Sequence, residues 1–168
     1  MVLRPAFRTY LETAWSTGAR IGSLLGVAAG DINWANRTLR LRHMKTKDGH
    51  TAILSTRATT QLQNWIDCLS QSPPWIGLGT RLLVTPNGRP LTGQWINWQL
   101  KRCAARAGIT KRVSTHVIRK SVGTIMARNN PKLAQLQLGI TSYVFNTHYK
   151  QPLLEDRLKR RDLLPATA

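Results

Sequence analysis

The chain has 168 residues, and its 25 Lys and Arg against 7 Asp and Glu give a formal net charge of +18 at pH 7. This length fits one ordinary domain, and a hydrophobic content of 42% is enough to build a core, which argues against a disordered chain. So large a positive charge repels itself unless a polyanion neutralises it. Nucleic acid is therefore the expected partner, and an anionic membrane surface is the less favoured one.

Apolar runs and cysteine content exclude other classes of protein. The longest apolar runs are far shorter than the roughly 20 residues of a membrane span, and no signal-peptide pattern opens the chain. The two cysteines, Cys68 and Cys103, are too few for a zinc-ligand set or a disulfide framework, which favours a reducing compartment. A secreted mini-protein, a membrane channel and a zinc finger are excluded.

The chain begins with helical periodicity. Apolar residues between Phe7 and Trp15 recur at i, i+3, i+4, i+7 and i+8, which predicts a helix that ends at Gly18. A second, short helix is predicted over 20–28, and the chain then turns at Gly30.

Strand-like patterns follow. Residues 38–43 alternate strictly between polar and apolar side chains, and a second β-prone run covers 51–54. The pair Asp48-Gly49 between these runs is a signal for a hairpin turn. Residues 81–84 are predicted as a third strand.

The remainder is predicted to be mainly helical. An apolar face over 58–69 predicts one helix, Thr92 is an N-cap residue for a second helix that runs to Gly108, and Ser114 or Thr115 caps a third. An Asn-Pro pair then breaks and restarts the chain. The expected fold class is mainly α with a small three-stranded antiparallel β-sheet, an α+β domain.

Several conspicuous side chains are expected to be structural. Cys68 and Cys103 fall on apolar helix faces, and we expect them in the core together with most of the tryptophans. His43 and His50, which flank the hairpin, are expected at the surface. Trp34 lies in a loop, where it could contact a nucleic acid.

Five basic or phenolic residues stand at junctions between the predicted elements. Arg20 begins a helix, Lys45 lies in the hairpin turn, and Tyr149 lies beyond the last core helix. His116 and Arg119 are three residues apart in the first turn of a helix, so their side chains share a face. Taken singly, each is more often a solvated or structural residue than a catalytic one.

With their flanking residues, these positions resemble the sequence boxes of the tyrosine recombinases, the family of phage integrases and Xer-type enzymes. The first box covers 17–25 and 31–32, the second covers 44–46 and the strand at 53–54, and the third covers 84–92. The fourth box, 115–121, contains the motif His-x-x-Arg. The fifth begins at 138–142 and ends at Tyr149. The boxes occur in the family's order and span nearly the whole chain. One box alone would be weak evidence, but five in register are strong evidence.

The resemblance implies a site that breaks and rejoins DNA. In this family a tyrosine hydroxyl, here that of Tyr149, attacks a phosphodiester, forms a 3′-phosphotyrosine and frees a 5′-hydroxyl strand. Arg20 and Arg119 would clamp the non-bridging oxygens, where the charge of the transition state gathers. Lys45 would protonate the departing 5′-oxygen, and His116 would assist proton transfer with Tyr149. Because the arginines supply electrostatic stabilisation, no metal ion or other cofactor is expected.

Further contacts with DNA phosphates are expected from Lys47, Arg42, Lys120 and His148. Lys47 competes with Lys45 for the role of general acid, because the register of the hairpin is open at this point, and Lys45 is favoured. The remaining Lys and Arg residues resemble a distributed phosphate-binding surface more than a solvated helix face.

Two positions depart from the family pattern. Ser23 stands where the family usually has a carboxylate, and Ile140 stands where it usually has a His or Trp that can hydrogen-bond the phosphate. Loss of one such donor typically costs on the order of a hundredfold or more in rate. His148, beside the tyrosine, could supply a substitute donor.

Residues 1–151 are expected to form the catalytic domain, and residues 152–168 a C-terminal tail. The resemblance implies that the tail docks on a neighbouring subunit, although its apolar side chains could equally fold back on their own domain. Family members carry a separate N-terminal DNA-clamping domain. We expect this domain to be absent here, so that the chain is either a fragment or a protein with half of the usual grip on DNA.

The predicted function is cleavage and rejoining of double-stranded DNA through a 3′-phosphotyrosine, in site-specific recombination or in integration of a mobile element such as a virus or plasmid. We expect a metal-independent enzyme that assembles on DNA as a homo-oligomer, a dimer or tetramer, in the cytoplasm of a prokaryotic host, without a membrane or a small-molecule cofactor. Two alternatives stay open: a non-catalytic DNA-binding descendant of the family, and a relaxing enzyme of the type IB topoisomerase kind.

Overall fold

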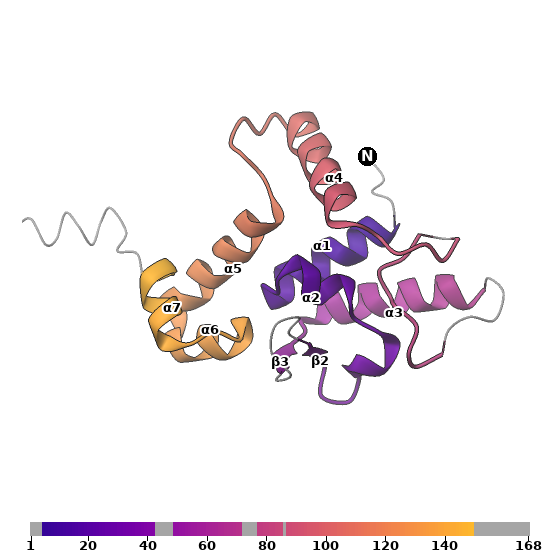
Figure 1. The fold of residues 1–168 in the computed structure, drawn as a ribbon, viewed down its shortest axis with the longest axis horizontal. Coiled ribbons are helices and arrows are strands. Elements are labelled where there is room, and N and C mark those ends of the chain that lie inside the picture. Colours follow the sequence, from indigo (N-terminus) through magenta and orange to yellow (C-terminus); the bar gives the residue numbers. More distant parts are fainter. Residues whose placement is uncertain (1–4, 43–48, 72–76, 86, 150–168) are drawn as a thin grey trace, which may run out of the picture.

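Helices dominate the structure (Figure 1), a computed structural model that describes residues 5–42, 49–71, 77–85 and 87–149. The helices are α1 (Pro5–Thr17), α2 (Ile21–Leu25), the short 3-10 helix η1 (Ala29–Asp31), α3 (Thr56–Ser70), α4 (Gly93–Arg106), α5 (Thr115–Asn129), α6 (Pro131–Leu138) and α7 (Ser142–His148). The strands are β1 (Ile32–Asn33), β2 (Thr38–Leu41) and β3 (His50–Ile53), which pair antiparallel in the order β1-β2-β3. The predicted fold class is confirmed.

The core forms where α1 packs against α3 (Figure 1). Phe7 and Tyr10 of α1 and Leu62 and Trp65 of α3 are each only 1% exposed. Burial of side chains of this size contributes about 1.5–3 kcal/mol each, so this interface is a main source of stability. Helices α5, α6 and α7 form a second group beside it, in which α5 packs against both α1 and α6. None of the described helices is long and apolar enough to cross a membrane.

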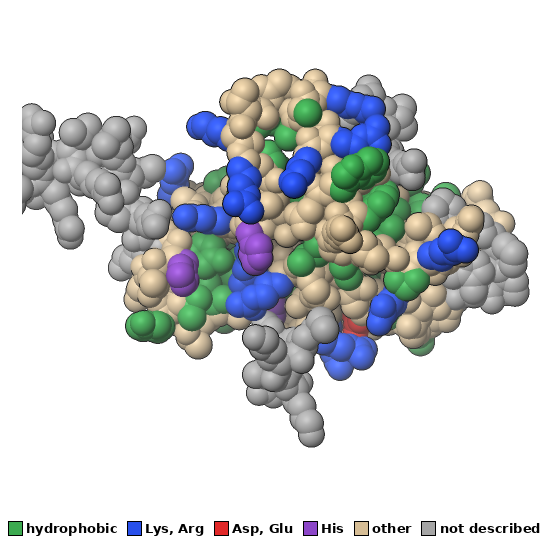
Figure 2. Space-filling view, turned by 45° about the horizontal axis from the view of Figure 1, so that its top comes forward, with side chains coloured by type: hydrophobic (Ala, Val, Ile, Leu, Met, Phe, Trp, Pro, Cys, Tyr) green, Lys and Arg blue, Asp and Glu red, His purple; other side chains and the backbone are tan. Residues whose placement is uncertain are grey.

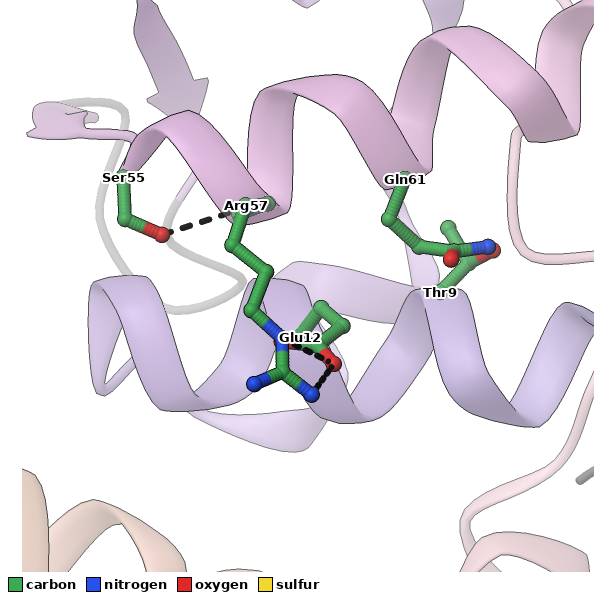
Figure 3. A network of polar contacts seen from close by, with 6 residues as sticks. Thr9, Glu12, Ser55, Arg57 and Gln61 are labelled. Atoms are coloured by element: carbon green, nitrogen blue, oxygen red, sulfur yellow. Dashed lines mark hydrogen bonds and ion pairs between the residues drawn. The ribbon is translucent and has the colours of Figure 1, made fainter.

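Polar contacts run along the edge of the interface between α1 and α3 (Figure 3). Arg57 of α3 forms an ion pair with the carboxylate of Glu12 at 2.7 Å, and Gln61 donates a hydrogen bond to the Thr9 hydroxyl at 3.2 Å. Because the Arg57 side chain is 76% exposed, its ion pair contributes at most about 1 kcal/mol. The buried apolar side chains, rather than this pair, hold the two helices together.

The third strand of the sheet is not the predicted one, because β1 takes that place instead of residues 81–84. The backbone of 81–84 divides its hydrogen bonds between separate segments. The N–H of Leu82 donates to the carbonyl of Val27 at 2.9 Å, and the carbonyl of Leu83 accepts from Leu91 at 3.0 Å. The consecutive side chains of Leu82 and Leu83 are both buried. Residues 81–84 therefore lack the alternation of buried and exposed side chains expected of a strand with one face in solvent.

Side-chain caps begin five of the described helices, and the sequence predicts two of these caps, Thr92 and Ser114. The side chains of Thr92, Ser114 and Asn130 accept hydrogen bonds from the backbone N–H three residues later, at 3.2, 3.4 and 2.9 Å. Helix α2 is shorter than the predicted helix over 20–28, because the chain leaves the helix at its C-cap, Gly26.

The prediction that the tryptophans and cysteines lie mostly in the core is confirmed only in part, for the buried Trp65 and for Trp95 and Cys103, which are partly buried against the core. Among the tryptophans that the structure describes, Trp65 alone is buried, whereas Trp15 and Trp98 are 54% and 49% exposed. Cys68 is exposed and Cys103 is half-buried. Trp98 lies two residues from both Ile96 and Leu100, so it points away from the buried face of α4.

Tyr10 is predicted to make the fold sensitive to alkaline pH. Burial raises the pKa of the Tyr10 phenol above its ordinary value, so above about pH 10 the unfolded chain loses this proton while the folded chain keeps it. The free energy of unfolding therefore falls with rising pH, with a contribution of up to about 1.4 kcal/mol per pH unit.

Urea unfolding at several pH values above about 10 measures this effect. In Tyr10→Phe the free energy of unfolding is expected to fall less steeply than in the wild type. Tyr143→Phe is the matched control, because that ring is 80% exposed, and it should keep the wild-type slope. Identical slopes for the wild type and Tyr10→Phe would contradict the assignment.

Candidate active site

A pocket of about 370 Å³ opens where α5 and α7 face the start of α2. Its lining residues are Arg20, His116, Arg119, Lys120, Ile140, Val144, His148 and Tyr149. The pocket thus brings together four of the five residues to which the resemblance assigns catalytic roles. The fifth, Lys45, lies outside the described residues, and so does Lys47.

Arg119 joins two distant parts of the chain beneath this pocket. Its side chain lies on α5 and the residue is only 5% exposed. Nη1 donates to the carbonyl of Gly18 at 2.7 Å, and Nη2 donates to the carbonyl of Leu138 at 3.1 Å. One carbonyl lies two residues before Arg20 and the other lies at the end of α6, before the helix that leads to Tyr149. The rigid guanidinium fork therefore sets the distance between these two segments.

The electrostatics of Arg119 favour an anionic ligand. Burial lowers the pKa of its guanidinium and nearby Arg20 lowers it further, while nearby Tyr149 raises it. No carboxylate lines the described part of the pocket. The positive charge is thus left for a ligand to neutralise, and a phosphate group matches both the charge and the fork geometry.

Gly18 allows the close approach that places Arg20 at the pocket. It follows α1 with φ +61°, and a Cβ at this position would lie 2.6 Å from Cδ2 of Leu138 and 3.1 Å from Cγ1 of Val122. Only glycine fits both this conformation and this contact. The Gly18 carbonyl can therefore reach Arg119, and Arg20 becomes the exposed N-cap residue of α2.

Tyr149 follows α7 directly, and its backbone N–H donates to the carbonyl of Phe145 at 2.9 Å. Its ring stacks on the buried Phe145 ring, with centroids 6.0 Å apart and an angle of 17° between the planes. A second neighbour of the ring is Gly123 of α5, where an added Cβ would overlap ring carbons Cδ1 and Cε1. Phe145 and Gly123 thus orient the phenol toward Arg119.

The other polar lining residues are solvent-exposed. His116 and Lys120 lie four residues apart on α5, and His148 is the last residue of α7. Ile140 forms an apolar wall with Val144. The position at which the family usually has a His or Trp therefore borders the pocket but offers no hydrogen-bond donor.

Arg42 and Ser23 lie apart from the pocket lining. Arg42 follows β2 and forms an ion pair of 3.0 Å with the carboxylate of Asp31, while its side chain stays 67% exposed. Ser23 is half-buried on α2. Within the ranges that the structure describes, no group of three or more His, Cys, Asp or Glu side chains is placed to hold a metal ion.

Sequence reasoning missed two contributions to this site. Gly123 receives the Tyr149 ring, and the available signal was a glycine inside a helical pattern, which often marks a close approach. His50, expected at the surface, is half-buried instead and lies 3.1 Å from the carbonyl of Gln137 through Nε2. No local pattern marks this second contact, because its partners are 87 residues apart.

Lys and Arg side chains spread over the face of the molecule shown in Figure 2, where red carboxylates are scarce. On α4 the guanidinium of Arg102 lies 4.5 Å from the centroid of the exposed Trp98 ring, so a cation and an aromatic face are presented together. The exposed basic residues include Arg8, Arg20, Arg37, Arg40, Arg42, Arg81, Arg89, Lys101, Arg102, Arg106, Lys111, Arg112, Lys120, Arg128 and Lys132.

Comparisons with known proteins agree with this architecture. The sequence profile of the phage integrase family matches residues 5–152. The chain is 27% identical to tyrosine recombinase XerC 2 of Ralstonia nicotianae, over 96% of this chain and 50% of that protein. It thus spans about half the length of this curated relative.

Two solved structures share the fold. The XerH site-specific recombinase bound to its difH substrate superposes with a TM-score of 0.74 at 20% identity, over 94% of this chain and 47% of that one. The lambda integrase dimer bound to a COC′ core site gives a TM-score of 0.68 at 20% identity, over 90% of this chain and 43% of that one. Because the family profile covers nearly all of the described residues, the chain belongs to the phage integrase family, that of the tyrosine recombinases.

Proposed function

We propose that this chain is the catalytic domain of a tyrosine recombinase, which cleaves and rejoins double-stranded DNA through a covalent 3′-phosphotyrosine at Tyr149. The observation that carries the proposal is the pocket in which Tyr149 meets Arg119, Arg20 and His116, with no carboxylate among its described lining residues. A nucleophile beside two guanidinium groups is the arrangement that phosphoryl transfer at a DNA backbone requires.

Each side chain has a defined part in the reaction. The hydroxyl oxygen of Tyr149 bonds to phosphorus, and the bond from phosphorus to the 5′-oxygen breaks. The phenolic proton leaves with the help of His116, and the 5′-oxygen takes a proton from Lys45. Arg20 and Arg119 stabilise the charge on the non-bridging oxygens. Because one phosphodiester replaces another, the reversed steps rejoin the strand without a co-reactant.

The basic surface and the structural neighbours support DNA as the partner. In their structures, XerH is bound to a difH substrate and the lambda integrase dimer is bound to a COC′ core site. We propose assembly of this chain on DNA as a homo-oligomer, with exposed Arg and Lys residues neutralising phosphates over an extended surface. The bacterial relative supports a prokaryotic host, and the match to the phage integrase family supports integration of a mobile element as the outcome of recombination.

Ser23 and Ile140 favour one second candidate, a DNA-binding descendant without cleavage activity. Both positions lack the polar groups usual in the family, and Ile140 borders the pocket itself. Such a protein would bind duplex DNA without covalent attachment. Relaxation of any supercoiled plasmid by the monomer would instead indicate a topoisomerase-like activity.

Covalent attachment to DNA tests the proposal. A nicked duplex library with randomised sequence traps the adduct, because the short strand beyond the cleavage site diffuses away and cannot be rejoined. We expect denaturant-resistant, protease-sensitive adducts with the wild type and none with Tyr149→Phe. Tyr143→Phe, whose ring is 80% exposed, is the matched control and should form adducts at the wild-type rate. Binding of the library without any adduct would favour the non-catalytic candidate.

The variant Arg119→Lys tests whether Arg119 acts in DNA cleavage or only in DNA binding. Lysine keeps the positive charge, but it cannot span the carbonyls of Gly18 and Leu138 and the phosphate at once. We expect adduct formation to fall by about a hundredfold or more, while affinity for duplex DNA stays within about threefold. An equal loss of cleavage rate and DNA affinity would show that Arg119 contributes to DNA binding alone.

His148 is proposed to supply the phosphate hydrogen bond that Ile140 lacks, since both residues line the pocket. His148→Ala is then expected to slow adduct formation by about tenfold or more. In the double variant His148→Ala with Ile140→His, the new imidazole should recover most of that loss. If His148→Ala cleaves at the wild-type rate, or if the double variant recovers nothing, this role is wrong.

A further inference from the structure

A buried amide side chain joins the sheet to the helix beside the pocket. Gln137 of α6 is 4% exposed. Its Oε1 accepts from the backbone N–H of Ile53 at 2.9 Å, and its Nε2 donates to the carbonyls of Ile53 at 2.7 Å and of Ser16 at 3.1 Å. Both amide hydrogens and the amide oxygen of this one side chain are therefore used.

These contacts make Gln137 a substitute for a missing neighbouring strand. β3 is an edge strand of the sheet, so the N–H and C=O that point away from β2 have no strand partner. The Gln137 amide pairs with both groups of Ile53, as the backbone of a fourth strand would. An apolar side chain of the same size would remove the partner of the Ile53 N–H and would leave the Ile53 carbonyl only a hydrogen bond of 3.4 Å from the Ser16 hydroxyl.

A second contact holds the other end of the strand. His50 begins β3, and its Nε2 lies 3.1 Å from the backbone carbonyl of Gln137. The imidazole also covers Gly139, which has φ +58° and has no room for a Cβ because the His50 ring occupies that space. β3 is thus attached to the end of α6 at both its first and its last residue.

The same turn of α6 anchors Arg119. The carbonyl of Leu138, the residue after Gln137, accepts from Nη2 of Arg119 at 3.1 Å. Adjacent residues of one helix therefore hold the edge of the sheet and the guanidinium of the pocket. Any shift of β3 along α6 would change the position of the hairpin relative to Arg119 and Tyr149.

We propose that Gln137 is a positioning residue for DNA cleavage, which fixes the register of the β2–β3 hairpin against the arginine of the pocket. This inference rests on the proposed function, in which Lys45, carried by the sequence between β2 and β3, protonates the leaving 5′-oxygen. Loss of the Gln137 amide should therefore impair protonation of the leaving group more than the attack by Tyr149.

A sulfur substitution in the DNA distinguishes these two steps. When the bridging 5′-oxygen is replaced by sulfur, the leaving group is a thiolate, whose conjugate acid has a pKa of about 8.5, and it departs without a general acid. A variant that is impaired only in leaving-group protonation should recover with this substrate. A variant with a generally damaged site should stay impaired.

The experiment compares adduct formation on a suicide duplex, selected from the randomised library, with either oxygen or sulfur at the cleavage position. For Gln137→Leu we expect a rate about tenfold or more below the wild type on oxygen, and a rate within about threefold of the wild type on sulfur. Gln137→Asn, whose shorter amide cannot reach Ile53 and Ser16 together, should show a smaller loss with the same recovery. Gln63→Leu, an exposed position on α3, is the control and should match the wild type on both substrates.

Hydrogen exchange at the Ile53 amide provides a readout that does not depend on catalysis. We expect faster exchange at Ile53 in Gln137→Leu, with protection kept at buried amides of α1 and α3. If Gln137→Leu is insoluble or unfolded, the comparison is made with Gln137→Asn instead. Equal losses on oxygen and sulfur, or no loss on oxygen, would overturn the positioning role.

Failure of the proposed function has a different signature. If the wild type forms no adduct on either substrate, the cleavage function is wrong and the role of Gln137 falls with it. If the wild type cleaves but Lys45→Ala does not recover on sulfur, the lysine assignment is wrong. A wild type that cleaves, a Lys45→Ala that recovers and a Gln137→Leu that does not recover would overturn the Gln137 inference alone.

Discussion

The guanidinium of Arg119 is the interaction on which the arrangement of this domain depends. It donates to two carbonyls, those of Gly18 and Leu138, which lie 101 and 19 residues away along the chain. A buried cation costs free energy unless its donors are satisfied, and here backbone oxygens satisfy part of the fork without neutralising its charge. The fold therefore holds an uncompensated positive charge beside Tyr149, and a bound phosphate would remove that cost.

This constraint explains why small residues surround the site. Gly18 lets the end of α1 come close enough for its carbonyl to reach Arg119, and Gly123 provides the surface on which the Tyr149 ring rests. Gly139 leaves space for the His50 ring, which links the same corner of α6 to β3. Each glycine permits a contact between segments that are distant in the sequence. The geometry of the pocket is thus set by backbone approach as much as by the polar side chains that line it.

Local patterns were sufficient for the helices but not for the tertiary contacts. Apolar periodicity and cap residues such as Thr92 and Ser114 depend on neighbours within a few residues, and the structure confirms these helices. The two-residue strand β1 is too short for a periodic signal, and residues 81–84 have the composition of a strand but divide their hydrogen bonds between separate segments. The meeting of Arg20, Arg119 and Tyr149 in one pocket was expected from the family resemblance alone. The sequence does not predict the role of Gln137, because the pattern of polar and apolar residues does not indicate which backbone groups its amide binds.

The most direct test of the account is the identity of the side chain that becomes linked to DNA. Trypsin cleaves after Lys132 and Lys150, so a single peptide, 133–150, contains both Tyr143 and Tyr149. Mass spectrometry of this peptide after nuclease trimming of the adduct should place a nucleotide 3′-phosphate on Tyr149, with Tyr143 unmodified. A nucleotide on Tyr143, or on any residue outside the pocket, would contradict the claim that phenol, guanidinium groups and imidazole act on one phosphorus atom.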